Sequence, residues 1–400
     1  MSARRVLAGS AVALLLPASL LLTVETGSAT DSAARPASTS VTKKASQKIS
    51  LEVLPQIVQQ GKRTASADSA KGAVTATIKP VKVGRKVVLE RLVGTSWKKV
   101  GTAKQEKSGR ANFSAAVSSG GAALTYRVTA QKFKGLKKVS STSADTTQWL
   151  APTFTDEFSG STLSPVWSMR GQEYEPQSKR KCSKGDPKAV KVGSGALRLS
   201  VIKDKSKSGK CTAKSRKQTK KISYRLNGHV GTEHSFAFTY GFAAARIKTQ
   251  PGRGQHAAFW MQAVGGQGTG GPKKGGAEID VIEWFGDGVK NGGLASFIYM
   301  LTEDGPKKVG GWIEDPDQYL ADQDDSWFDA YHVFSVEWTP DEYIFRIDGQ
   351  ETWRTDQGIS HQPQYPILSL LSSDYELENL GKVSNLPQTM QVDWLKFWEA

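Results

Sequence analysis

The stretch Gly275-Gly276-Ala277-Glu278-Ile279-Asp280-Val281-Ile282-Glu283-Trp284-Phe285-Gly286 decides how this chain folds. It places three carboxylates among β-branched and aromatic residues, and glycines close both of its ends. This composition predicts a buried β-strand, because β-branched and aromatic residues favour strands and glycine marks turns. A helix would place Glu278 and Glu283 about 140° apart around its axis, where they could not act together.

The spacing of the acids predicts an irregularity in that strand. On a regular strand Glu278 and Asp280 share one face, and Glu283 points to the other. A β-bulge between Asp280 and Glu283 would turn all three carboxylates to the same side. The two glutamates could then approach the roughly 5 to 5.5 Å separation found in retaining glycosidases. Such a triplet also arises by chance, but three carboxylates on a buried strand are costly unless they line a wet cleft.

Motifs on both sides of this strand resemble those of glycoside hydrolase family 16, the laminarinase and β-glucanase group with a concanavalin A-like jelly roll. In chain order they are FTDEF (154–158), YGFAAARIK (240–248), GQHAAFWM (254–261), YHVFSVEWTPD (331–341), FRIDG (345–349) and VDWLKF (392–397). The resemblance covers residues 150–400 and implies an all-β jelly-roll catalytic domain. It also implies a retaining, endo-acting hydrolase in which Glu278 is the nucleophile, Glu283 is the general acid and base, and Asp280 orients Glu278.

Aromatic side chains are expected in the cleft, since sugar rings pack their C–H faces on them. The expected substrate contacts are Trp260, Trp284, His256, Tyr299 and Trp312. We expect a polysaccharide substrate, with a β-1,3-containing glucan favoured. An agarose-type galactan, a transglycosylase activity and a non-catalytic carbohydrate-binding protein on the same fold remain open. The resemblance implies no required cofactor, and it places Glu157 and Asp393 near a structural calcium site of some relatives.

The N-terminal end predicts export. Arg4 and Arg5 precede an apolar run over residues 6–22, and small residues follow, which is typical of a signal peptide over residues 1–29. A membrane anchor is the alternative, but Pro17 interrupts a run of marginal length. We therefore expect a secreted, extracellular monomer that is not bound to a membrane once the leader is removed.

A second domain is predicted between the leader and the catalytic region. Residues 30–46 are rich in Ser, Ala and Thr and read as a flexible linker. Short strand-like runs between Gly and Ser turns over residues 47–148 predict a small antiparallel sandwich, which loosely resembles immunoglobulin-like modules. Residues 41–148 hold 21 Lys or Arg against 5 Asp or Glu. Such a basic module would favour an anionic cell-wall polymer over nucleic acid, although its lysines could serve only solubility.

The two cysteines, Cys182 and Cys211, predict one disulfide. They are the only cysteines of the chain, and an even count in an exported protein favours pairing. They bracket most of a basic segment, residues 178–221, that carries 16 Lys or Arg and 2 acids. Two thiolates make a poor zinc site, so metal binding by the pair is disfavoured.

Overall fold

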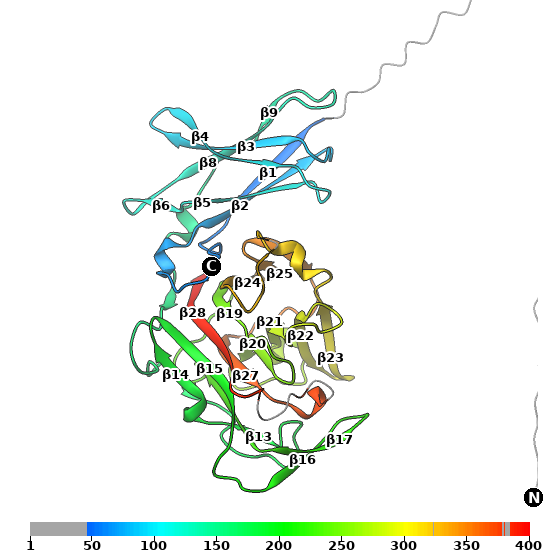
Figure 1. The fold of residues 1–400 in the computed structure, drawn as a ribbon. Helices are drawn as coiled ribbons and strands as arrows, with labels where there is room; N and C mark the ends of the chain where they lie inside the picture. Colours follow the sequence, from blue (N-terminus) through cyan, green and yellow to red (C-terminus); the bar gives the residue numbers. More distant parts are fainter. Residues whose placement is uncertain (1–45, 323, 378–379, 381–384) are drawn as a thin grey trace, which may run out of the picture. The chain divides into compact units, whose positions relative to one another are not determined.

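A computed structural model describes residues 46–322, 324–377, 380 and 385–400. The predicted signal peptide (1–29) and nearly all of the predicted linker (30–46) lie outside the described residues. Within them the chain is almost entirely β-structure, with one helical turn, α1 (Pro272–Gly275), and short 3₁₀ turns (Figure 1). In this described part no helix is long and apolar enough to cross a membrane.

The N-terminal strands form a small sandwich of two antiparallel sheets. One sheet has the order β1 (Lys48–Val53), β2 (Gly72–Lys79), β5 (Arg110–Ala115). The other has the order β10 (Ala144–Asp145), β8 (Thr125–Ala130), β3 (Lys86–Val93), β4 (Ser96–Lys104), and β9 (Val139–Ser140) pairs with β8. Val74, Ile78, Leu89 and Val128 are buried between the sheets, because each strand turns alternate side chains inward. We call this sandwich the N-terminal module.

The C-terminal strands form one long sheet. Its order is β23 (Gly305–Trp312), β22 (Leu294–Thr302), β21 (Glu278–Trp284), β20 (His256–Ala263), β27 (Gln364–Leu371), β18 (Arg225–Gly231), β15 (Ala196–Lys203), β28 (Gln388–Glu399), β19 (Gly241–Lys248), β24 (His332–Trp338), β25 (Tyr343–Ile347) and β26 (Gln350–Thr355). The short strands β11 (Phe154–Asp156), β12 (Ser168–Met169), β13 (Ser183–Gly185) and β14 (Val190–Gly193) pair onto it.

The long sheet folds over on itself at the β18–β15 pair. Phe259 and Ile279 from the half that runs from β23 to β18 share one core with Phe334 and Leu395 from the other half. Two halves of one sheet that bury a common core form a sandwich. The all-β jelly roll predicted from the sequence is therefore confirmed.

The outer face of β19, β24 and β28 is also largely buried, so these strands carry apolar side chains on both faces. Ala243 and Ala245 face the inner core, whereas Phe242 and Ala244 face outward. The outer face is covered by residues of the β1–β2 connection and by Trp149. The buried cluster contains Leu54, Ile57, Ala67, Ala70, Ala73, Trp149, Phe242, Ala244, Val333, Trp394 and Trp398. We call residues 54–73 the covering segment.

Polar contacts fix the covering segment on this face. The Lys396 ammonium is fully buried and donates to Gln56 Oε1 at 3.0 Å. The buried Arg246 guanidinium donates from Nε to the carbonyl of Gln59 at 2.6 Å and from Nη1 to that of Arg63 at 3.0 Å. The covering segment therefore shields these two cations from water and also supplies hydrogen-bond acceptors to them, while Asp393 of the jelly roll pairs with Arg246.

We expect the module and the jelly roll to unfold in one transition, because they share this buried cluster. Ile57 is fully buried in the cluster. Ile57→Asp should therefore lower the one Tm by roughly 5 °C or more. Scanning calorimetry checks this, with Val81→Asp at an exposed module position as the matched control. Two separate transitions in the parent protein would contradict the expectation.

The predicted disulfide is present between Cys182 and Cys211. Both half-cystines are buried with Ala213 and Leu377 in a small cluster of their own. The bond ties the segment before β13 to the hairpin of β16 (Lys210–Lys214) and β17 (Thr219–Ser223). The disulfide thus anchors the basic segment that begins at residue 178.

Replacing both cysteines by serine should lower the free energy of unfolding by about 3 to 4 kcal/mol, since the bond closes a loop of this length. The two positions are separated by 29 residues. Equilibrium denaturation of the double variant, compared with the parent under non-reducing conditions, measures the loss. A change below about 1 kcal/mol would show that the bond constrains the unfolded chain far less than the loop model requires.

Candidate active site

The bulge predicted from the acid spacing is present in β21. The β21–β22 register shifts between Asp280 and Glu283. Glu278 pairs with Tyr299, Asp280 with Phe297 and Glu283 with Ala295. Positions 295, 297 and 299 alternate on β22 and so share one face, which means that their three partners share it too. Val281 and Ile282, the residues of the bulge, are buried in the core.

Burial raises the pKa of each of the three carboxyl groups. The pKa of Asp280, which is only 4% exposed, is raised well above its usual range by desolvation and then by the charges of Glu283 and Glu278. The pKa of Glu278 is raised by desolvation, and the charge of Glu283 adds to this. Carboxylates that repel one another in a buried site take up protons more readily than exposed ones do. The arrangement can therefore hold one acid protonated beside another that is ionised.

Asp280→Asn should make the fold more stable, with an advantage that grows as the pH rises. A carboxyl group whose folded-state pKa is raised destabilises the fold once the pH passes its unfolded value of about 3.9, and asparagine carries no such charge. We expect equal Tm values near about pH 4 and a variant Tm higher by at least about 2 to 4 °C near about pH 8. Thermal melts across this range measure the difference, with the exposed Glu303→Gln as the control. A variant that is less stable at high pH would contradict this expectation.

Glu283 lies beside a buried histidine. His256 Nε2 is 3.7 Å from Glu283 Oε1, and His256 Nδ1 is 3.1 Å from Glu376 Oε1. The Tyr375 hydroxyl lies 3.3 Å from His256 Nδ1. His256, one of the predicted substrate contacts, is only 2% exposed. Its ring therefore lies between two carboxylates.

Glu278 accepts a hydrogen bond from an amide that is itself held in place. Gln262 Nε2 donates to Glu278 Oε2 at 3.2 Å. The Gln262 carbonyl oxygen accepts from Arg170 Nη2 at 3.1 Å and from the Tyr365 hydroxyl at 2.9 Å. Arg170 in turn pairs with Glu233 at 2.6 Å. This network fixes the Gln262 donor toward Glu278 and stabilises its ionised form.

Three of the predicted aromatic contacts lie on the acid-bearing face. Trp260 is the β20 partner of Asp280, and it lines a pocket of about 340 Å³. Tyr299 is the β22 partner of Glu278. Trp312 pairs with Ala295, the partner of Glu283, and is 39% exposed. The three rings therefore border the acids on one face of the sheet.

Trp284 requires a correction. It follows Glu283 directly, so strand alternation sends it to the opposite face. It is 3% exposed within the main core, and its Nε1 donates to the carbonyl of Gln250 at 2.6 Å. Trp284 is therefore a core residue that cannot contact a substrate.

Two cations that the sequence alone does not identify as site residues lie near the acids. Arg180 and Lys308 lower the pKa of Asp280 and Glu283 against the larger raising effect of burial. Arg180 Nε donates to Ser373 Oγ at 3.1 Å, and the Lys308 ammonium lies 4.4 Å from the centre of the Phe297 ring. The basic run at 178–221 was visible in the sequence, but nothing in it singled out Arg180.

Glu157 and Asp393 do not fit the calcium site that the resemblance implied. Asp393 forms a buried ion pair with Arg246, and a cation in this position repels a second one. Glu157 accepts from the backbone N–H of Ala67 at 3.2 Å. No group of three or more potential ligands among His, Cys, Asp and Glu occurs within the described residues.

A model of the glycosyl hydrolases family 16 matches residues 189–396. Among solved structures, the chain is similar to the laminarinase catalytic domain from Thermotoga maritima (18% identity, 62% of this chain and 98% of that chain, TM-score 0.48). It is also similar to an endo-β-1,3-glucanase from Pyrococcus furiosus (20%, 61% and 92%, TM-score 0.47) and to the catalytic domain of a laminarinase from Thermotoga petrophila (18%, 62% and 96%, TM-score 0.45). A comparison with curated protein sequences gives no match.

Proposed function

The chain belongs to glycosyl hydrolase family 16, and from this premise we propose that it is a secreted, retaining endo-hydrolase of a β-1,3-containing glucan. The observation that carries the proposal is the bulge that brings Glu278, Asp280 and Glu283 to one face of β21. Three carboxylates on one face, beside aromatic rings, would supply the acid, the nucleophile and the sugar contacts that glycoside hydrolysis requires.

In the proposed first step, a carboxylate oxygen of Glu278 attacks the anomeric carbon of the sugar. Glu283 gives its proton to the glycosidic oxygen as the bond between that oxygen and the anomeric carbon breaks. A covalent glycosyl ester with Glu278 results, and the rest of the polysaccharide leaves. The Gln262 donor supports this role for Glu278, because it stabilises the anion that must attack.

In the second step, Glu283 takes a proton from water, and the water oxygen attacks the anomeric carbon. The bond to Glu278 breaks, and the Glu278 carboxylate is regenerated. Two inversions leave the anomeric configuration unchanged. His256, which contacts Glu283 and Glu376, would hold Glu283 in the orientation that both proton transfers need.

A substrate panel tests the proposal. Laminarin, mixed-linkage glucan, agarose and a galactan are each incubated with the protein, and new reducing ends are counted. We expect long products early from laminarin, since endo-action cuts inside the chain, and proton NMR should show a first product that keeps the β-configuration. A protein that binds these glycans without releasing reducing ends would instead be a carbohydrate-binding protein.

An anionic galactan is the second candidate substrate. The pocket lined by Trp260 is also lined by Arg170, Lys179, Arg180 and Lys184, against Glu173 and Glu175. This excess of cations beside the acids would favour sulfate or carboxylate groups on a substrate. Faster cleavage of a sulfated galactan than of laminarin would select this candidate.

Export is proposed from the leader-like residues 1–29, and the disulfide suits an oxidising compartment. Anion binding by the basic module stays a prediction.

A further inference from the structure

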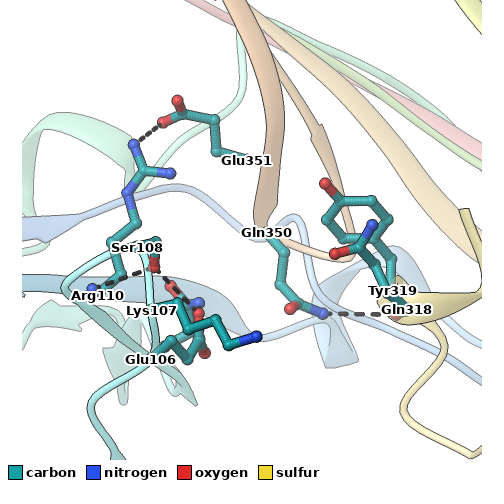
Figure 2. A pocket seen from close by; sticks show the side chains of 9 residues that line it. Glu106, Lys107, Ser108, Arg110, Gln318, Tyr319, Gln350 and Glu351 are labelled. Atoms are coloured by element: carbon teal, nitrogen blue, oxygen red, sulfur yellow. Dashed lines mark hydrogen bonds and ion pairs between the residues drawn. The ribbon is translucent and has the colours of Figure 1, made fainter. Parts of the chain in front are cut away.

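A groove lies where the N-terminal module meets the jelly roll. Its volume is about 480 Å³, which is within the usual range for ligand sites. The turn between β4 and β5 supplies one wall, with Glu106, Lys107 and Asn112 at or near it. The other wall holds residues of β26 and of the 3₁₀ turn η4 (Pro316–Tyr319), and Figure 2 shows the two walls facing each other.

The two walls are held together. Arg110 Nη2 on the module lies 2.6 Å from Glu351 Oε2 on β26, and both side chains are largely shielded, at 27% and 14% exposed (Figure 2). The covering segment fixes the module to the jelly roll at the outer face of β19, β24 and β28. Because both walls are held in place, the groove persists in the folded protein.

The groove is continuous with the surface that leads to the acids. A second pocket, of about 520 Å³, is lined by Trp312 and shares Gln318 and Tyr319 with the groove. The Trp312 ring lies 5.0 Å from the Phe285 ring. The Phe285 ring lies 5.3 Å from that of His256, which contacts Glu283. A line of rings therefore leads from the acids to the groove.

The groove has the chemistry of a sugar-binding surface. Gln318 and Gln350 carry amides that can both donate and accept, Tyr319 offers a half-buried ring, and Lys107 extends toward Gln350 (Figure 2). Hydroxyl groups of a sugar accept from and donate to such side chains, and its C–H face packs on the ring. Acidic and basic residues occur together in the walls, which favours a neutral ligand over a highly charged one.

We propose that a polysaccharide chain bound at Glu278 and Glu283 continues over Trp312 into this groove, where the N-terminal module supplies part of a distal sugar-binding site. The inference rests on the proposed function, since it assumes a long glycan at the acids. The module then helps to select long chains, and a short oligosaccharide held only at the acids does not reach it.

The test removes two exposed groove side chains, one from each wall, in the double variant Lys107→Ala, Gln318→Ala. We expect KM for the polysaccharide to rise about tenfold, equivalent to about 1.4 kcal/mol of binding. The value of kcat should not change, because contacts far from the cleaved bond stabilise the bound substrate and the transition state equally. For a short aryl glycoside, kcat/KM should stay within about twofold of the parent value. The matched control is Lys98→Ala, Gln357→Ala, which removes the same residue types at exposed positions outside the groove.

An unchanged KM for the polysaccharide would overturn the inference, and so would an equal loss on the polymer and on the aryl glycoside. The proposed function is tested separately, because it fails if the parent cleaves none of the glycans. In that case, binding of the polymer to the Glu278→Gln variant tests whether the groove holds a sugar chain. Weaker binding after the Lys107 and Gln318 changes, but not after the control changes, supports the inference, and equal binding overturns it.

Discussion

Glu278→Gln is expected to lower kcat on the preferred glucan by about 10³- to 10⁵-fold, which corresponds to about 4 to 7 kcal/mol of transition-state stabilisation. Glutamine keeps the size of the side chain but cannot attack the anomeric carbon. The fold should remain intact, because Glu278 lies on the cleft face and is not part of the core clusters. Initial rates and circular dichroism measure the two effects, and Glu303→Gln, at an exposed position, is the control.

Azide distinguishes a nucleophile from a residue that only supports the site. In Glu278→Ala a small anion can enter the vacated space and attack the anomeric carbon of an activated aryl glycoside directly. One displacement inverts the configuration, so the product should be an α-glycosyl azide. A near-parental rate in Glu278→Gln, or a β-azide from Glu278→Ala, would remove the nucleophile assignment.

Glu283→Ala is expected to lower kcat on the polysaccharide by about 10²- to 10⁴-fold, the usual range for a lost general acid. The loss should depend on the leaving group. An aryl oxide with a low pKa leaves without protonation, so formation of the glycosyl ester should fall by less than about tenfold. Pre-steady-state release of the phenol measures this step.

The same variant should yield a β-glycosyl azide, because azide then replaces water in the second step after the first inversion has occurred. The bell-shaped pH profile should also lose its alkaline limb, since that limb reports the group that must be protonated. Equal losses on the polysaccharide and on the activated aryl glycoside would show that Glu283 is not the proton donor.

The acid-bearing strand could be predicted because the spacing of its own residues is enough to show where the bulge must lie. Strand periodicity is two, so the separation of five positions from Glu278 to Glu283 leaves one residue in excess, and a bulge is the ordinary way to absorb it. The structure has that bulge between Asp280 and Glu283. The same parity places Trp284 in the core, because alternation along a strand decides the face of a side chain and closeness to the acids does not.

The partners of the acids could not be predicted, because they come from distant parts of the chain. Glu376 is 120 residues from His256, and the sequence contains no signal that pairs them. Arg180 depends on the path of a loop that the disulfide anchors. The periodicity of a strand predicts which face of the sheet a side chain lies on. It does not predict which residues from distant parts of the chain lie beside that side chain.

The module was predicted as a small sandwich, and the structure has two sheets around a common core there. Its attachment was not foreseen. Leu54 and Ile57 looked like ordinary module residues, yet they cover Phe242 and Trp394 of the jelly roll. Apolar residues in a sequence predict that a segment is buried, but they do not predict which part of the protein it packs against.

The covering segment makes the folding unit larger than the part of the chain that the family pattern matches. The family pattern spans residues 189–396 and contains Arg246 and Lys396. It does not contain Gln56, Gln59 and Arg63, whose oxygens accept hydrogen bonds from these two cations. The jelly roll alone would expose the apolar side chains of Phe242, Val333 and Trp394 to water, so the catalytic part depends on the segment before it for its stability.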